Sequence, residues 1–357
     1  MGQMVTQLQP INEESLALAD VLLRQGQVVA FPTETVYGLG GWALSEEAAS
    51  RIYEAKGRPG DNPLIVHIAP GFSLDSLVAS QPPYTKELIE KFWPGPLTLI
   101  MPKAATIPSK ITGGRDTVAI RMPAHPAALA LLQRTGLPIA APSANTSGKP
   151  SPTTAEHVRQ DLSGKIPLII DGGACEVGLE STVLDLTVNP PAILRPGAIT
   201  RDMLLTVLPD VIGGEAKLSS GHAVSDEEIP KAPGMKYPHY APKGHLVVTD
   251  ADAQQLMDLV GQAKLQKKVG LIVTNQMAEK LVGVSAKVIL LGDRTKPEEV
   301  AAGLFSALRA ADEYGLTLIY GEALPETGLG AAIMNRFLKA ASEELWLNKK
   351  GCGKDKK

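Results

Sequence analysis

Two basic side chains and one amide side chain lie close together in the sequence, where a segment with a helical pattern is followed by a stiff loop. Lys56 closes the segment "SEEAASRIYEAK", and Arg58 and Asn62 follow in the loop "GRPGDNP". One interpretation is a helix C-terminus, because the macrodipole favours cations there. The other is an anion-binding site, which a stiff loop that holds two cations and an amide suits better.

Two arginines end or interrupt apolar runs. Arg121 lies in the alternating run "DTVAIRM", on the same strand face as Thr117. Because the strand is apolar, a guanidinium there needs an anionic partner. That partner could be an internal carboxylate, such as Asp116 or Asp185, or the carboxylate of a ligand. Arg195 ends the run "AILR" and is either a surface charge or a further cation of the same site.

Short hydroxyl and amide side chains follow several other apolar runs. In "FPTETVYGLG", two threonines follow the apolar run "QVVAF", and glycines, which have no side chain, come soon after them. "PIAAPSANTSGKPSPTT" and "GLESTVLDL" repeat this arrangement, which is also typical of an Asn/Ser-rich turn and a helix N-cap. Taken together with the cations, these groups suit a binding site for a polyanion and a small zwitterion, and such a site does not need a Walker loop.

The elements that would position these groups are short strands and helices in no strict alternation. We expect strands at 27–31, 63–68, 96–101, 117–122, 138–142, 167–171, 181–186 and 192–196, with helices at 45–56, 84–92, 125–135 and 153–162. This pattern predicts an α/β catalytic domain over residues 10–210, built on a twisted mixed sheet flanked by helices.

The rest of the chain divides into a linker, a second domain and a tail. Residues 211–243 are rich in Gly, Ser and Pro, yet "GMKYPHYAP" carries tyrosines that suggest docking onto the first domain. Strands and helices alternate regularly over 244–347 and end in a helix at 329–347, which predicts a smaller, Rossmann-like parallel α/β domain. Residues 348–357 form a basic tail that we expect to be disordered.

Composition narrows the function classes. The 357 residues are 44% hydrophobic and 20% charged, with a net charge of -3. This excludes a protein that binds along nucleic acid by its positive charge alone. Two cysteines build neither a disulfide framework nor a zinc site, and no apolar run approaches a membrane span. We therefore expect a cytoplasmic protein with no membrane partner. GxxxxGK[ST], HExxH, CxxC and GxSxG are all absent.

Six motifs in order carry a family resemblance: "FPTETVYGLG", "KGRPGDNPLIVH", "WPGPLTLIM", "DTVAIRMPAHP", "PSAN" and "LRPG". They resemble the YrdC-like domain of threonylcarbamoyl-AMP synthases, and "APGMKYPHYAP" with the following α/β domain resembles the long, two-domain form. The resemblance runs from about Val28 to Lys339. It implies synthesis of L-threonylcarbamoyladenylate from L-threonine, bicarbonate and ATP with release of pyrophosphate. Partner transferases then modify position 37 of tRNA.

The same resemblance implies roles for individual residues. The residues expected to bind ATP are Lys56, Arg58, Asn62, Thr117, Ser143, Asn145, Ser151, Arg195 and Tyr237. Those expected to bind threonine are Thr33, Thr35, His67, Arg121, Ala141 and Ser181. Lys56, Arg58 and Arg121 would be catalytic, and Tyr237 and Tyr240 would form a lid. Mg²⁺ would be bound through the ATP phosphates without protein ligands, no organic cofactor is implied, and tRNA contact would be weak.

Two other classes remain open at this stage. The basic residues could grip an RNA backbone without catalysis, although the acidic net charge and few aromatic residues argue against a stacking surface. Alternatively, the chain could form a different carbamoyl-adenylate. Pyrophosphate release that requires threonine and bicarbonate together distinguishes the synthase from an RNA-binding module, and tests with serine and carbamoyl phosphate as substrates distinguish the third class.

Overall fold

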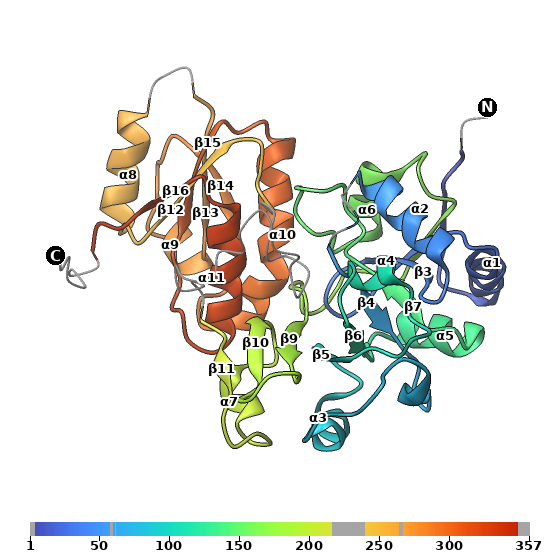
Figure 1. The fold of residues 1–357 in the computed structure, drawn as a ribbon. Coiled ribbons are helices and arrows are strands. Elements are labelled where there is room, and N and C mark those ends of the chain that lie inside the picture. Colours follow the sequence, from blue (N-terminus) through green and yellow to red (C-terminus); the bar gives the residue numbers. More distant parts are fainter. Residues whose placement is uncertain (1–3, 58–59, 61, 216–239, 264–266, 349–357) are drawn as a thin grey trace.

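The computed structural model describes residues 4–57, 60, 62–215, 240–263 and 267–348 (Figure 1). Arg58, Tyr237, most of the predicted linker and nearly all of the predicted tail lie outside these residues. Within the described part of the chain, no helix is long and apolar enough to cross a membrane.

The first domain is built on one mixed sheet of eleven strands in the order β1-β8-β2-β3-β7-β4-β6-β5-β9-β10-β11. Its strands are β1 Gln7–Pro10, β2 Val29–Phe31, β3 Gly38–Trp42, β4 Ile65–His67, β5 Leu97–Pro102, β6 Thr117–Arg121, β7 Ile139–Ala141, β8 Leu168–Asp171, β9 Thr182–Asp185, β10 Ala192–Arg195 and β11 Ile212–Gly213. Its helices are α1 Glu13–Arg24, α2 Glu46–Lys56, α3 Thr85–Phe92, α4 Ser109–Thr112, α5 Pro126–Thr135, α6 Ala155–Leu162 and α7 Arg201–Leu204. The predicted mixed, helix-flanked sheet is confirmed.

Alternation along β2 shows why the central strands read as short apolar runs. Ala30 packs into one core cluster, whereas Val29 and Phe31 pack into another, so the strand is buried on both faces. The neighbouring strand comes so close that a Cβ at Gly40 would lie 2.6 Å from the Phe31 ring. Glycine after the "FPTET" segment is therefore a packing requirement.

The second domain is a five-stranded sheet in the order β14-β13-β15-β12-β16, with every pair parallel. Its strands are β12 His245–Thr249, β13 Val269–Val273, β14 Lys287–Leu290, β15 Leu318–Glu322 and β16 Glu343–Leu345. Its helices are α8 Ala253–Gln262, α9 Asn275–Ala278, α10 Pro297–Glu313 and α11 Leu329–Ala340. Helix α10 lies on the side of this sheet that faces the first domain (Figure 1).

The two domains share a hydrophobic cluster. Val36 and Leu179 of the first domain pack with Phe305 of α10 and Phe337 of α11. Tyr240, from the end of the linker, is buried in the same cluster, with its ring 5.0 Å from that of Phe305. The second domain is therefore packed against the first along α10 and α11.

Three boundaries differ from the prediction. The helix predicted over 329–347 ends at Ala340, because residues 343–345 leave it to pair with the free edge of β12. The first domain extends beyond 10–210, since β1 pairs with β8 and β11 pairs with β10. These short edge strands have little apolar alternation of their own, and distant strands supply their partners.

Candidate active site

Most of the predicted site residues line one pocket of the first domain, at the ends of neighbouring strands. The wall includes Thr33, Thr35, His67, Arg121, Ala141, Ser143, Asn145, Ser151, Ser181, Arg195 and Tyr240. Sheet order explains the convergence, since β7, β4, β6, β5, β9 and β10 are successive neighbours. His67 and Arg121, for example, are register partners at the ends of two parallel strands.

Arg121 is buried, and the guanidinium has three neighbours in the protein. Nε donates to the Gly95 carbonyl at 3.1 Å, and Nη1 donates to Thr35 Oγ1 at 2.8 Å. Nη2 lies 2.6 Å from Glu34 Oε1. The internal partner is therefore Glu34, and neither Asp116 nor Asp185 fills this role.

Glu34 remains ionised despite its burial. Burial alone would raise the pKa of this carboxyl, but the Arg121 guanidinium outweighs it, and the pKa lies below its ordinary value. The sequence analysis did not single out Glu34, although it stands between the two threonines of the "PTET" stretch. Its position between two site residues was the available signal.

His67 is neutral at physiological pH. Burial, followed by the nearby positive charge of Arg121, lowers the pKa of the imidazole to about 3. Nδ1 lies 3.1 Å from the Ile65 carbonyl, which can only accept, so this nitrogen carries the hydrogen. A group with this pKa can shape the pocket and form hydrogen bonds, but it is too weak a base to take a proton from an ammonium group.

Arg195 is the second cation of the pocket wall, and it is buried, so the surface-charge interpretation is wrong. Nε donates to the Ser181 carbonyl at 3.0 Å and Nη2 to Ser181 Oγ at 3.1 Å. Burial lowers the pKa of Arg195 to about 10, although the Glu180 carboxylate acts in the opposite direction. The side chain therefore remains charged at physiological pH.

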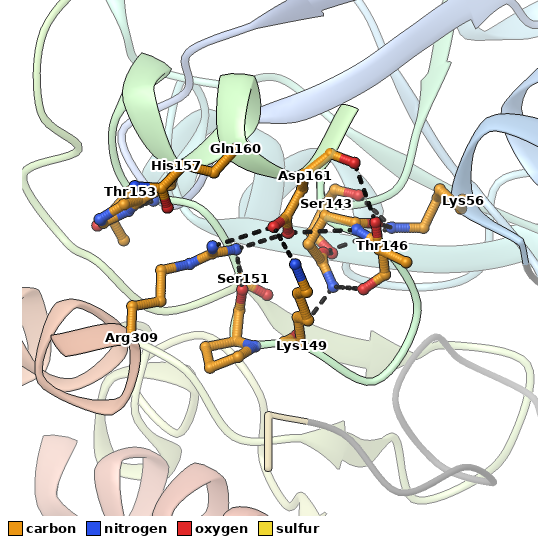
Figure 2. A network of polar contacts seen from close by, with 12 residues as sticks. Lys56, Ser143, Thr146, Lys149, Ser151, Thr153, His157, Gln160, Asp161 and Arg309 are labelled. Carbon is orange, nitrogen blue, oxygen red and sulfur yellow. Dashed lines mark hydrogen bonds and ion pairs between the residues drawn. The ribbon is translucent and has the colours of Figure 1, made fainter. Parts of the chain in front are cut away.

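Lys56 binds the loop that carries the predicted nucleotide residues. Its ammonium donates to the carbonyls of Ser143 at 2.5 Å and Asn145 at 2.7 Å (Figure 2). Ser143 Oγ in turn donates to Asn145 Oδ1 at 2.5 Å. Lys56 thus ties the end of α2 to the loop instead of capping its own helix. Direct contact with a phosphate stays a prediction.

The far side of this loop is held from the second domain. Asp161 of α6 accepts from Arg309 Nη2 at 2.9 Å and from Lys149 Nζ at 2.9 Å, as Figure 2 shows. Arg309, on α10, also donates to the Pro150 carbonyl at 2.5 Å. The loop between β7 and α6 is consequently fixed on both sides.

Three predicted nucleotide residues of the described chain do not line the pocket: Lys56, Thr117 and Asn62. Thr117 opens β6 and is half-buried. Asn62 is fully buried, and neither atom of its side-chain amide has a hydrogen-bond partner among the described residues. An amide buried in this state is costly, so a ligand group that pairs with it would be stabilised.

Of the two predicted lid residues, the structure describes Tyr240. It lines the pocket, is buried against Phe305, and adopts a left-handed backbone conformation with φ of 72°. Tyr237, the other predicted lid residue, lies outside the described residues.

Glu180 is a further pocket residue that the sequence analysis did not select, although it precedes Ser181 directly. Ser151 Oγ donates to this carboxylate at 2.6 Å, and Arg336 of α11 donates to it at 3.0 Å. Burial would raise the pKa of Glu180, but Arg336 and then Arg195 bring it down to about 2. The pocket region thus combines the buried cations Arg121, Arg195 and Arg336 with the carboxylates Glu34 and Glu180, an excess of positive charge that suits an anionic ligand.

Protein ligands for a metal are a separate question. Among the described residues, no group of three or more His, Cys, Asp or Glu side chains could hold a metal ion. Binding of Mg²⁺ through the ATP phosphates stays a prediction.

The mixed sheet, the parallel second domain and the basic pocket between strand ends define a two-domain α/β ligand-binding protein. The family model described as "Telomere recombination" (Sua5_yciO_yrdC) matches residues 21–197. The model described as "Threonylcarbamoyl-AMP synthase, C-terminal domain" matches residues 199–342.

Curated relatives and a solved structure agree with these models. The threonylcarbamoyl-AMP synthase of Bacillus subtilis is 48% identical over 92% of this chain and 94% of that protein. The threonylcarbamoyl-AMP synthase of Pyrococcus abyssi is 47% identical over 93% of this chain and 95% of that protein. The crystal structure of P. abyssi Sua5 complexed with L-threonine superposes with a TM-score of 0.85 at 44% identity, covering 96% of this chain and 99% of that one. The chain belongs to the threonylcarbamoyl-AMP synthase family.

Proposed function

We propose that this protein synthesises L-threonylcarbamoyladenylate from L-threonine, bicarbonate and MgATP, with release of pyrophosphate. Family membership supports the activity, and the L-threonine complex of the P. abyssi relative supports the amino-acid substrate. The observation that carries the proposal is that Arg121 and Arg195, from strands far apart in the sequence, both line the wall of one pocket. The proposal includes a cytoplasmic location, transfer of the product by separate enzymes to position 37 of tRNA, and at most weak contact with tRNA.

The Arg121 side of the pocket is the proposed threonine subsite. Arg121 would pair with the threonine carboxylate, and the hydroxyls of Thr35 and Ser181 would bind its polar groups. His67 would accompany them as a neutral hydrogen-bonding group. Ala141, beside these residues, leaves room for the ligand to approach the backbone.

The Arg195 side, with the loop of Ser143, Asn145 and Ser151, is the proposed nucleotide subsite. Guanidinium and hydroxyl donors match phosphate oxygens, and Mg²⁺ would arrive bound to the phosphates. Lys56 acts here by holding the loop, and Arg58, Asn62, Thr117 and Tyr237 complete the proposed set.

The chemistry requires positioning more than a protein nucleophile. The threonine amine attacks bicarbonate, forming a carbamate and releasing water. A carbamate oxygen then attacks the α-phosphorus of ATP in line, and pyrophosphate leaves with its magnesium. Fixed cations stabilise the charge that develops on the phosphates. Both the carbamate and the adenylate hydrolyse readily, so the buried Tyr240 in the pocket wall would serve to exclude water.

Pyrophosphate release tests this function. With ATP and Mg²⁺ present, we expect release only when L-threonine and bicarbonate are both added, together with a product of the mass of threonylcarbamoyladenylate. Serine or carbamoyl phosphate in place of threonine or bicarbonate serves as a control for another carbamoyl-adenylate. Salt-sensitive RNA binding without threonine-dependent turnover would instead identify a binding module.

A further inference from the structure

Glu180 is the point at which the pocket meets the second domain. Its buried carboxylate accepts from Ser151 Oγ at 2.6 Å on one oxygen and from Arg336 Nε at 3.0 Å on the other. A hydrogen bond to the same carboxylate helps to raise the pKa of Tyr240, after burial as the main cause. One acidic side chain thus contacts a proposed nucleotide residue, the lid tyrosine and a residue of α11.

Arg336 joins two segments of the first domain. Its side chain is 0% exposed, and besides the Glu180 carboxylate it binds two backbone carbonyls. Nη1 donates to Pro196 at 2.6 Å, and Nη2 donates to Glu180 at 3.3 Å. Pro196 follows Arg195 and Glu180 precedes Ser181, so Arg336 fixes the neighbours of the two residues that hydrogen-bond to each other in the pocket wall.

Charge gives Arg336 a second role. Glu180 is a buried carboxylate, and such a group needs a cationic partner. With Arg336 in place, that need is met from the second domain, and Arg195 directs Nε and Nη2 to Ser181. Without Arg336, the cations that still act on Glu180 include Lys339 and Arg195, and Arg195 is the side chain that the proposed nucleotide subsite requires.

We propose that Arg336 is a positioning residue through which the second domain balances the charge of Glu180 and so keeps Arg195 available for the phosphates of the nucleotide. This inference rests on the proposed function in that it takes ATP as the ligand of the Arg195 side. It gives the second domain a task in the reaction without any contact between that domain and the substrate.

Simple attachment of the domains is the competing explanation, and Arg309 provides the matched control. Arg309 is also a buried arginine of the second domain, and it also forms an ion pair with a carboxylate of the first, Asp161. Its guanidinium donates to Asp161 of α6 and to the Pro150 carbonyl of the loop between β7 and α6. If attachment alone matters, Arg309→Met and Arg336→Met should behave alike.

The experiment compares ATP affinity by calorimetry and turnover by pyrophosphate release in Arg336→Met, Glu180→Gln, the double variant, and Arg309→Met with and without Glu180→Gln. We expect Arg336→Met to weaken ATP binding about tenfold or more and to change the threonine KM by less than about threefold. Adding Glu180→Gln removes the unbalanced charge and should recover most of the loss. The same addition should not improve Arg309→Met.

The outcomes separate the two proposals. Recovery in the Arg336→Met/Glu180→Gln double variant alone supports the inference. The inference is overturned if Arg336→Met and Arg309→Met lose ATP affinity equally, in proportion to their fall in melting temperature, and Glu180→Gln restores neither. Wild-type protein that binds ATP but releases no pyrophosphate with threonine and bicarbonate counts against the proposed function, while the ATP affinities of the variants still decide the inference.

Discussion

Arg121→Lys is expected to raise the threonine concentration needed for half-maximal turnover by about 100-fold, with a much smaller change for ATP. Lysine retains the charge but loses the planar fork, which binds Gly95, Thr35 and Glu34 at once. Losing the paired geometry toward a carboxylate corresponds to about 3 kcal/mol. Initial rates at varied threonine and at varied ATP measure the two effects separately.

A companion pair separates binding from stability. Arg121→Met leaves Glu34 buried without its cation, which should cost about 3 kcal/mol or more in the free energy of unfolding. Adding Glu34→Gln should restore much of that stability without restoring threonine affinity. Equal losses for threonine and ATP in Arg121→Lys would show that Arg121 does not define the threonine subsite.

Lys56→Met is expected to lower kcat/KM for ATP by about 100-fold or more, equivalent to about 3 kcal/mol of transition-state stabilisation. The buried ammonium holds the carbonyls of Ser143 and Asn145, and without it the loop loses the geometry of its hydroxyl and amide donors. Arginine should not substitute, because the fully buried position is packed around a compact ammonium.

Lys149→Met is the matched control for Lys56. Lys149 lies in the loop that Lys56 holds and forms an ion pair with Asp161, and its side chain is 45% exposed. A partly exposed pair contributes about 1 kcal/mol or less, so the ATP parameters should change less than about fivefold. If both lysine variants lose activity equally, the effect lies in the charge of the loop rather than in the buried contacts of Lys56.

The sequence was informative wherever a residue's surroundings were local. Apolar runs ending in polar residues located β2, β4, β6, β7 and β10, and the ends of these strands carry the pocket. The regular alternation after residue 244 gave the parallel second sheet in the same way. The family resemblance, which the relatives confirm, then supplied expected roles for individual residues, and these roles stay predictions.

What the sequence missed depends on partners far apart in the chain. Arg121 needed an anion, but which one depends on which distant segment packs beside the end of β6, and it proved to be Glu34. Likewise, in the sequence Arg336 resembles any other polar residue of an amphipathic helix. Only the packing of the two domains shows that it donates to the Glu180 carboxylate. Residues 343–345 look helical and form a strand because the edge of β12 is free to pair.

The central claim is that an amino acid and a nucleotide bind side by side in the pocket that Arg121 and Arg195 line. A crystal structure of the protein with L-threonine and a non-hydrolysable ATP analogue tests it most directly. We predict the threonine carboxylate on Arg121 and the phosphates beside Arg195, Ser143 and Ser151, with the amine facing the α-phosphate. Threonine or nucleotide bound elsewhere, with Arg121 and Arg195 engaged only by Glu34 and Ser181, would contradict the account.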